Sequence, residues 1–139
     1  MTQILPWQPN ETCEFVIRQL AEGNCVALPT ESTYEVVASA SCPEAVASLA
    51  AEPQPAIVLG DFPNLHDWLP LLRGAGPRLF RKLGAGPFLL CADGGFRQGA
   101  WSRLPESSQR LLVRDGQIAI RWPEHAIWDE LRVANLPLV

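Results

Sequence analysis

Short apolar runs of strand type alternate along the chain with stretches in which apolar residues recur at helical spacing. The apolar runs predict strands over residues 25–28, 36–40, 56–59, 88–92, 117–121 and 136–139. The remaining pattern predicts an irregular loop over 96–103 and helices over 11–22, 43–51, 64–72, 77–83, 105–112 and 123–132. Because strands and helices mix without strict alternation, we expect an α/β (α+β) domain built on one twisted mixed sheet with flanking helices.

Turn and capping residues mark the ends of several predicted elements. Asn10 or Thr12 can cap the first helix, and Gly23 suits the position just after it. Pro43 opens the second helix at its first turn. Residues 52–55 end that helix, because they contain two prolines and proline cannot continue a helix.

The strand predicted at 25–28 breaks at Pro29 and leads into the hydroxyl and acidic residues of the stretch 30–33. Ligands commonly bind just beyond strand ends in open α/β sheets, so this turn is a candidate binding site. The alternative is a structural turn whose hydroxyls bond the local backbone. Taken alone, these residues favour the structural turn.

The turn also contains a short motif formed by Pro29, Thr30, Glu31 and Tyr34, after a strand that Gly23 precedes. This motif resembles the signature of the YrdC-like family, the threonylcarbamoyl-AMP synthases of tRNA modification, which reads Pro-Thr-(Glu/Asp)-Thr-x-Tyr-Gly-Leu. Three positions differ from the signature: Ser32 replaces its second threonine, Glu35 its glycine and Val36 its leucine.

Three later segments resemble the family in the same order along the chain. The first contains Gly86, Pro87 and Leu90, which match a family segment Pro-Gly-Pro-Leu-Thr-Leu. The second contains Arg121, Pro123, Glu124 and His125, which match a strand that ends Arg-x-Pro before an acidic residue and histidine. The third, residues 136–139, resembles the strand before the family's Thr-Ser-Ala-Asn segment. The resemblance implies a single YrdC-like domain over 1–139, C-terminally short relative to the family.

Three departures from the family concern its chemistry. The family has a Lys-x-Arg motif before the strand at 56–59, but residues 49–56 contain no lysine or arginine and include Glu52. The only lysine, Lys82, lies well beyond that region. The Ser and Asn of the family's nucleotide segment would follow Val139. Glu35 adds bulk and negative charge where glycine would allow close approach of the backbone to a ligand.

The resemblance implies a ligand cavity lined by Thr30, Ser32, Tyr34 and Arg121, although Arg121 has a local alternative, an ion pair with a carboxylate such as Glu124. No residue is assigned a catalytic role, and ATP, threonine and bicarbonate are implied only if the family activity is retained. One hypothesis is a catalytically impaired descendant or member of the synthase family. The second, which we favour for activity, is a non-catalytic module that keeps the fold for a small ligand or a protein partner. A third is a fragment of a longer protein.

Charge and cysteine content narrow these hypotheses. A net charge of −4 predicts no tight autonomous binding of nucleic acid. Four scattered cysteines without a Cys-x-x-Cys pair predict reduced thiols in a cytoplasmic protein and no metal site. No run approaches the ~18 apolar residues of a membrane span. The cluster of Arg78, Arg81 and Lys82 is expected to be a solvated helix face.

Overall fold

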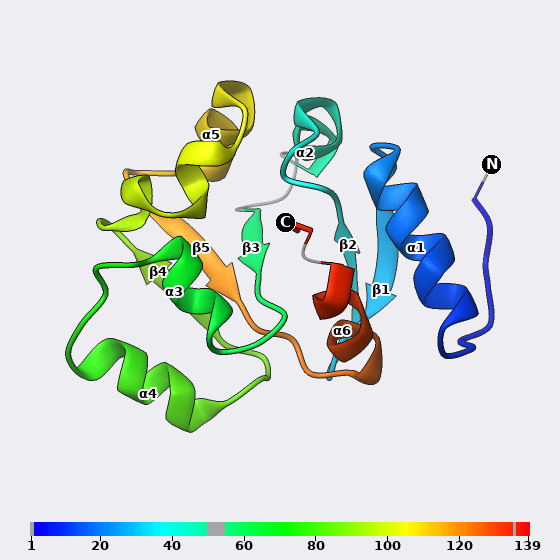
Figure 1. The fold of residues 1–139 in the computed structure, drawn as a ribbon, viewed down its shortest axis with the longest axis horizontal. Helices are drawn as coiled ribbons and strands as arrows, with labels where there is room; N and C mark the ends of the chain where they lie inside the picture. The colour runs from blue at the N-terminus through cyan, green and yellow to red at the C-terminus, as the bar shows by residue number, and fades with distance from the viewer. Residues whose placement is uncertain (1, 50–54, 135) are drawn as a thin grey trace.

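A two-stranded sheet follows the first helix (Figure 1) in the computed structural model, which describes residues 2–49, 55–134 and 136–139. It pairs β1 (Val26–Pro29) antiparallel with β2 (Tyr34–Val37). Successive side chains of a strand point to opposite faces. Accordingly Leu28 and Val37 are buried, whereas Tyr34 and Val36 are exposed.

A three-stranded sheet forms the other half of the molecule (Figure 1). Its central strand is β5 (Ile118–Arg121). On one side β5 pairs parallel with β3 (Ala56–Val58), and on the other it pairs antiparallel with β4 (Leu89–Ala92). The sheet is therefore mixed, as predicted, and β4 lies at its edge.

The prediction of one continuous sheet is wrong, because β1 and β5 belong to separate sheets. The C-terminal residues connect the two sheets. Leu138 forms antiparallel bridges with Ser39 and with Val58, and the N–H of Val58 donates to the carbonyl of Leu138 at 2.9 Å. These are single bridges rather than a ladder, which is why the segment predicted as a strand at 136–139 joins the sheets without merging them.

Six α-helices and three short 3₁₀ helices surround the sheets in the part of the chain that the structure describes. Their bounds are α1 (Glu11–Ala21), α2 (Pro43–Leu49), α3 (Asn64–Trp68), α4 (Ala75–Leu83), α5 (Glu106–Leu112), α6 (Ala126–Leu131), η1 (Phe96–Gln98), η2 (Ala100–Arg103) and η3 (Arg132–Ala134). No helix in 2–49, 55–134 or 136–139 has the length and apolarity needed to cross a membrane.

Two predicted helices are shorter than expected, each for a local reason. The helix predicted from 123 begins only at Ala126, because His125 is its N-cap and accepts a hydrogen bond from the N–H of Ile127 at 3.2 Å. The helix predicted over 64–72 ends at Trp68, two residues before Pro70, which has no N–H to continue it. The end of the helix predicted over 43–51 lies outside the described residues.

The hydrophobic core has two parts, and β3 separates them. Ile57 packs with residues of α2, α3, α4 and α5, whereas the next residue, Val58, packs with residues of α1, α6 and the first sheet. The C-terminal segment divides in the same way, with Val139 in the first cluster and Leu138 in the second. We call the contact of residues 137–139 with β3 and with residues 38–40 the seam, because both parts of the core meet there.

Candidate functional site

The turn between β1 and β2 is held by the side chain of Thr30, which is 9% exposed. Its hydroxyl donates to the carbonyl of Thr33 at 2.9 Å and accepts from the N–H of Thr33 at 3.2 Å. The N–H of Thr30 donates to the same carbonyl at 2.7 Å. The hydroxyl of Thr30 thus bonds the local backbone, as the structural interpretation of this turn expects.

Arg121, at the end of β5, forms ion pairs with two carboxylates, Glu31 in the turn between β1 and β2 and Glu35 in β2. Its Nη2 lies 2.7 Å from Oε1 of Glu31 and 2.7 Å from Oε1 of Glu35, and its Nε donates to Oε2 of Glu35 at 2.9 Å. The guanidinium side chain is only 13% exposed. Glu124, the partner suggested by sequence, contributes its backbone N–H to Glu31 instead, at 3.0 Å.

The charges at this turn compensate each other unevenly. Burial alone would raise the pKa of Glu31, but the N–H groups of Glu124 and of Glu31 itself, together with Arg121, outweigh burial and lower that pKa. Glu31 is therefore a carboxylate at neutral pH. One guanidinium faces two carboxylates, so the cluster of Glu31, Glu35 and Arg121 has a formal charge of about −1 and disfavours an anionic ligand.

The four residues predicted to line a ligand cavity differ in their contacts and in their exposure. Thr30 bonds within its own turn, and Arg121 is held by two carboxylates. Ser32 is exposed, and Tyr34 is 72% exposed on the uncovered face of β2. The turn itself is fastened to α6, because the indole N–H of Trp128 donates to the carbonyl of Pro29 at 2.9 Å. The ligand role of the four residues stays a prediction.

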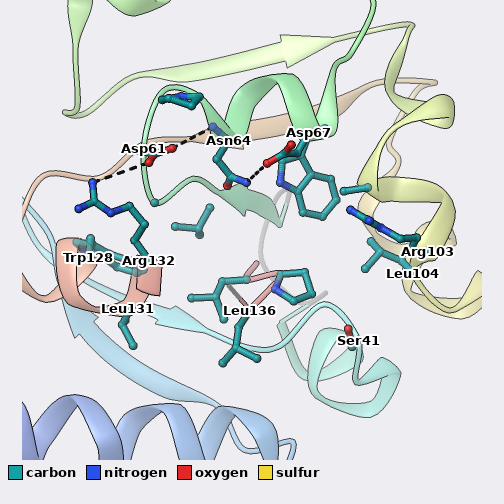
Figure 2. A pocket seen from close by; sticks show the side chains of 17 residues that line it. Ser41, Asp61, Asn64, Asp67, Arg103, Leu104, Trp128, Leu131, Arg132 and Leu136 are labelled. Atoms are coloured by element: carbon teal, nitrogen blue, oxygen red, sulfur yellow. Dashed lines mark hydrogen bonds and ion pairs between the residues drawn. The ribbon is translucent and has the colours of Figure 1, made fainter. Parts of the chain in front are cut away.

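A cavity of about 570 Å³ lies between α3, η2 and the α6–η3 segment (Figure 2). Its apolar lining includes Val58, Trp68, Trp128, Leu131, Leu136 and Leu138, and its polar lining includes Ser41, Asp61, Asn64, Asp67, Arg103 and Arg132. The volume lies within the range usual for small-molecule sites, about 300–1,000 Å³. None of Thr30, Ser32, Tyr34 and Arg121 lines this cavity.

Four side chains order the polar wall of the cavity (Figure 2). Asp61 follows β3 and accepts a hydrogen bond from the N–H of Asn64 at 3.0 Å, which holds the start of α3. The side-chain amide of Asn64 donates to Asp67 at 2.9 Å. Arg132 approaches Asp61 at 3.8 Å, and both side chains remain partly exposed. This pair is looser than the cluster at Arg121.

This cavity was not predicted from the sequence, although one signal for it was present. The pair Gly60-Asp61 follows the predicted strand 56–59, and a polar residue just beyond a strand end in a mixed sheet is a recognised site signal. The rest of the lining could not be found, because it comes from segments that are distant in sequence. No group of three histidine, cysteine or acidic side chains able to hold a metal occurs in the described parts of the chain.

Comparison of the coordinates with solved structures places this architecture among known folds. E. coli YciO superposes with a TM-score of 0.77 at 18% sequence identity, over 100% of this chain and 69% of that one. A double-alanine variant of P. abyssi Sua5 superposes with a TM-score of 0.72 at 22% identity, over 92% of this chain. The fold is YrdC-like.

The YrdC-like assignment rests on structure, since no family model and no curated protein matches the sequence. The chain spans 39% of the length of the Sua5 chain and 69% of the YciO chain. At these sequence identities the likeness concerns the fold alone. It confirms the fold implied by the motifs at Pro29–Tyr34 and Arg121–His125.

Proposed function

We propose that this chain is a non-catalytic YrdC-like module, one that does not make threonylcarbamoyl-AMP and uses the fold to bind a small ligand or a protein partner. The observation that carries the proposal is the double pairing of Arg121 with Glu31 and Glu35. The cation that the resemblance assigns to the ligand site is occupied by the chain's own carboxylates. One of them, Glu35, stands where the family signature has glycine.

Electrostatics supports the same conclusion. Threonine, bicarbonate and ATP each bring at least one anionic group, and two unit charges ~4 Å apart interact by about 4 kcal/mol at an effective dielectric of 20. Fixed cations normally compensate such repulsion. The stretch 49–56, where the family has Lys-x-Arg, contains neither lysine nor arginine. Residues 50–54, Glu52 among them, lie outside the described part of the chain.

The test is pyrophosphate release with threonine, bicarbonate and ATP, measured beside an authentic synthase of the family. We expect no threonine-dependent release, because loss of even one well-placed electrostatic contact costs on the order of a hundredfold in rate. Release within a hundredfold of the authentic synthase would overturn the proposal and favour the impaired-synthase hypothesis with a role in tRNA modification. The variant Glu35→Gly restores the family residue and should also stay inactive, since it supplies no new cation.

The cavity beside α3 supports the small-ligand form of the proposal. Its apolar interior and its polar wall of Asp61, Asn64, Asp67, Arg103 and Arg132 suit a small molecule that has both apolar and polar parts. Thermal-shift measurement against a panel of nucleotides, amino acids and organic acids tests this form. Stabilisation that Leu136→Trp abolishes would support it, and an absence of any shift would leave the protein-partner form as the function.

We further propose a cytoplasmic location. All four cysteines are free thiols, and Cys25 and Cys91 are exposed. Exposed free thiols suit a reducing compartment. Thiol counting in cell extracts quenched with alkylating agent tests this, and disulfide-linked Cys25 or Cys91 in the extracted protein would contradict it.

A further inference from the structure

The basic residues of this acidic chain are unevenly distributed. Residues 68–92 contain four basic residues, Arg73, Arg78, Arg81 and Lys82, and no acidic one. The rest of the chain therefore carries seven basic residues and all fifteen acidic residues. Three of the four cations lie on α4, which stands at the end of the molecule away from α1 (Figure 1).

Helix α4 turns one face inward and leaves a mixed face outside. Pro77 and Phe80 are buried against the core. Arg78 and Lys82 are exposed and lie four residues apart, so they are neighbours on the outer surface of the helix. Leu79 and Leu83 have the same spacing and form a second row beside the cations, with exposures of 59% and 44%.

The cations of this segment have no carboxylate partner among the described residues. The ion pairs found there involve Arg110, Arg121 and Arg132. Arg73 donates to the carbonyls of Pro70 and Leu72, and the guanidinium of Arg81 lies 5.6 Å from the centre of the Phe62 ring. No ion pair among the described residues therefore compensates the positive charge of the segment.

Exposed apolar side chains gather in the same segment. Half of the exposed large apolar residues of the described chain lie here, namely Leu71, Leu79, Leu83, Phe88 and Leu89. Isolated exposed leucines are ordinary, but a concentration of them beside unpaired cations is typical of an interaction surface. We call the residues Arg78, Leu79, Lys82 and Leu83, which form the two outer rows of α4, the α4 surface.

We propose that the α4 surface binds an acidic amphipathic segment of a partner protein. Charge complementarity requires an anionic partner, and the leucine row beside the cations requires one with apolar side chains as well. A membrane is a poorer match, because the helix has nine residues and its fullest apolar face, at Pro77 and Phe80, points into the core. A nucleic acid would use the cations and leave Leu79 and Leu83 without a role. This surface is separate from the turn at Thr30, so the inference holds whatever the outcome of the synthase assay.

The test uses a fluorescein-labelled synthetic peptide of sixteen residues, with glutamates and leucines arranged on two faces of a helix. Its matched control keeps every glutamate and replaces each leucine with serine. Fluorescence anisotropy is measured with the full chain at 50 and 150 mM salt. We expect the acidic amphipathic peptide to bind at least fivefold more tightly than the serine control, since both rows of the α4 surface contribute.

Two double variants test whether the peptide binds at the α4 surface. Arg78→Glu/Lys82→Glu should weaken binding at least tenfold, and Leu79→Ser/Leu83→Ser at least threefold. The control Arg110→Glu reverses a charge on α5 and should change binding less than twofold. All four side chains of the two test variants are exposed, and circular dichroism with thermal melting checks that both variants fold as the parent does.

Several results would overturn the proposal. They are a peptide affinity weaker than about 1 mM, equal binding of the two peptides, or insensitivity to both double variants. A mobility shift with single- or double-stranded RNA near 150 mM salt that is tighter than the peptide would assign the surface to nucleic acid instead. Co-sedimentation with phosphatidylserine vesicles, or charge-sensitive self-association in analytical ultracentrifugation, without peptide binding would assign it to a membrane or to a second copy.

Discussion

Polar side chains follow both β1 and β3. Those after β1 are paired within the chain, whereas those after β3 border a cavity. At the turn after β1, Arg121 pairs with Glu31 and with Glu35, each at 2.7 Å, and its side chain is only 13% exposed. After β3, Asp61 and Arg132 approach only to 3.8 Å and border an open cavity (Figure 2). Polar residues beyond a strand end therefore indicate a site only when their charges are not already used within the chain.

Gly99, next to the cavity-lining residue Ala100, packs closely against the backbone of α3, and its substitution should have the largest effect. A Cβ added there would lie 2.4 Å from the carbonyl oxygen of Asp67 and 2.6 Å from that of Trp68. Both atoms belong to the backbone of α3 and cannot yield cheaply. We expect Gly99→Ala to lower the free energy of unfolding by about 3 kcal/mol, measured by urea denaturation.

A second glycine supplies the control for this prediction. A Cβ added at Gly94 meets no atom within 4 Å, and its φ is not positive. Gly94→Ala should therefore change stability by less than about 0.5 kcal/mol. Equal effects of Gly99→Ala and Gly94→Ala on stability would contradict tight packing between Gly99 and α3.

Removal of Arg121 tests how much its two ion pairs contribute to the free energy of unfolding. Arg121→Met keeps most of the side-chain volume but leaves Glu31 and Glu35 with no cation, so we expect a loss of about 2–3 kcal/mol in denaturant unfolding. The exposed pair of Arg110 and Glu106 is the control, with side chains 75% and 78% exposed. Arg110→Met should cost no more than about 0.5 kcal/mol. Similar losses for both arginines would contradict a structural role for Arg121.

Contacts between residues close in sequence could be predicted, whereas contacts between distant segments could not. The hydroxyl bonding of Thr30 was foreseeable, because its partners lie within three residues. The pairing of Arg121 with Glu31 and Glu35 was not, since it depends on how the end of β5 meets the turn after β1. Four of the strands predicted from apolar runs lie within one residue of the observed strands, but the strand predicted over 36–40 is observed at Tyr34–Val37. The segment predicted as a strand over 136–139 forms only the isolated bridges of Leu138. The division of the strands into two sheets rests on these single bridges, which no periodicity encodes.

The two carboxylates that pair with Arg121 should contribute unequally to the stability of the fold. Glu31 also accepts the N–H of Glu124 and is 14% exposed, whereas Glu35 bonds only Arg121 among the described residues and is 28% exposed. We expect Glu31→Gln to cost about 1.5 kcal/mol and Glu35→Gln less than about 1 kcal/mol. A larger loss for Glu35→Gln, measured by the same urea titration, would reverse the assignment of the anchoring carboxylate.

The smallest expected effect is the pH dependence of the stability that Glu31 contributes. The pKa of Glu31 is lowered in the folded protein from an ordinary value of 4.5. Its ionisation therefore stabilises the fold fully above that value, and this contribution fades as the pH falls through the lowered pKa. The stability gap between the parent chain and Glu31→Gln should be present at pH 7 and should shrink below about pH 4.5. A gap that stays constant from pH 7 down to pH 3 would contradict it.

The seam made by residues 137–139 has a consequence for the order of folding. Leu138 meets Ser39 and Val58, so its contacts close loops that contain most of the chain. Long loops cost more entropy to close than the short hairpin of β1 and β2, whose register needs only a four-residue turn. We therefore expect the hairpin to form early and the seam late, after the folding barrier. Weakening the seam at Leu138 would then speed unfolding and leave the folding rate nearly unchanged, so the seam would set how long the native state lasts once formed.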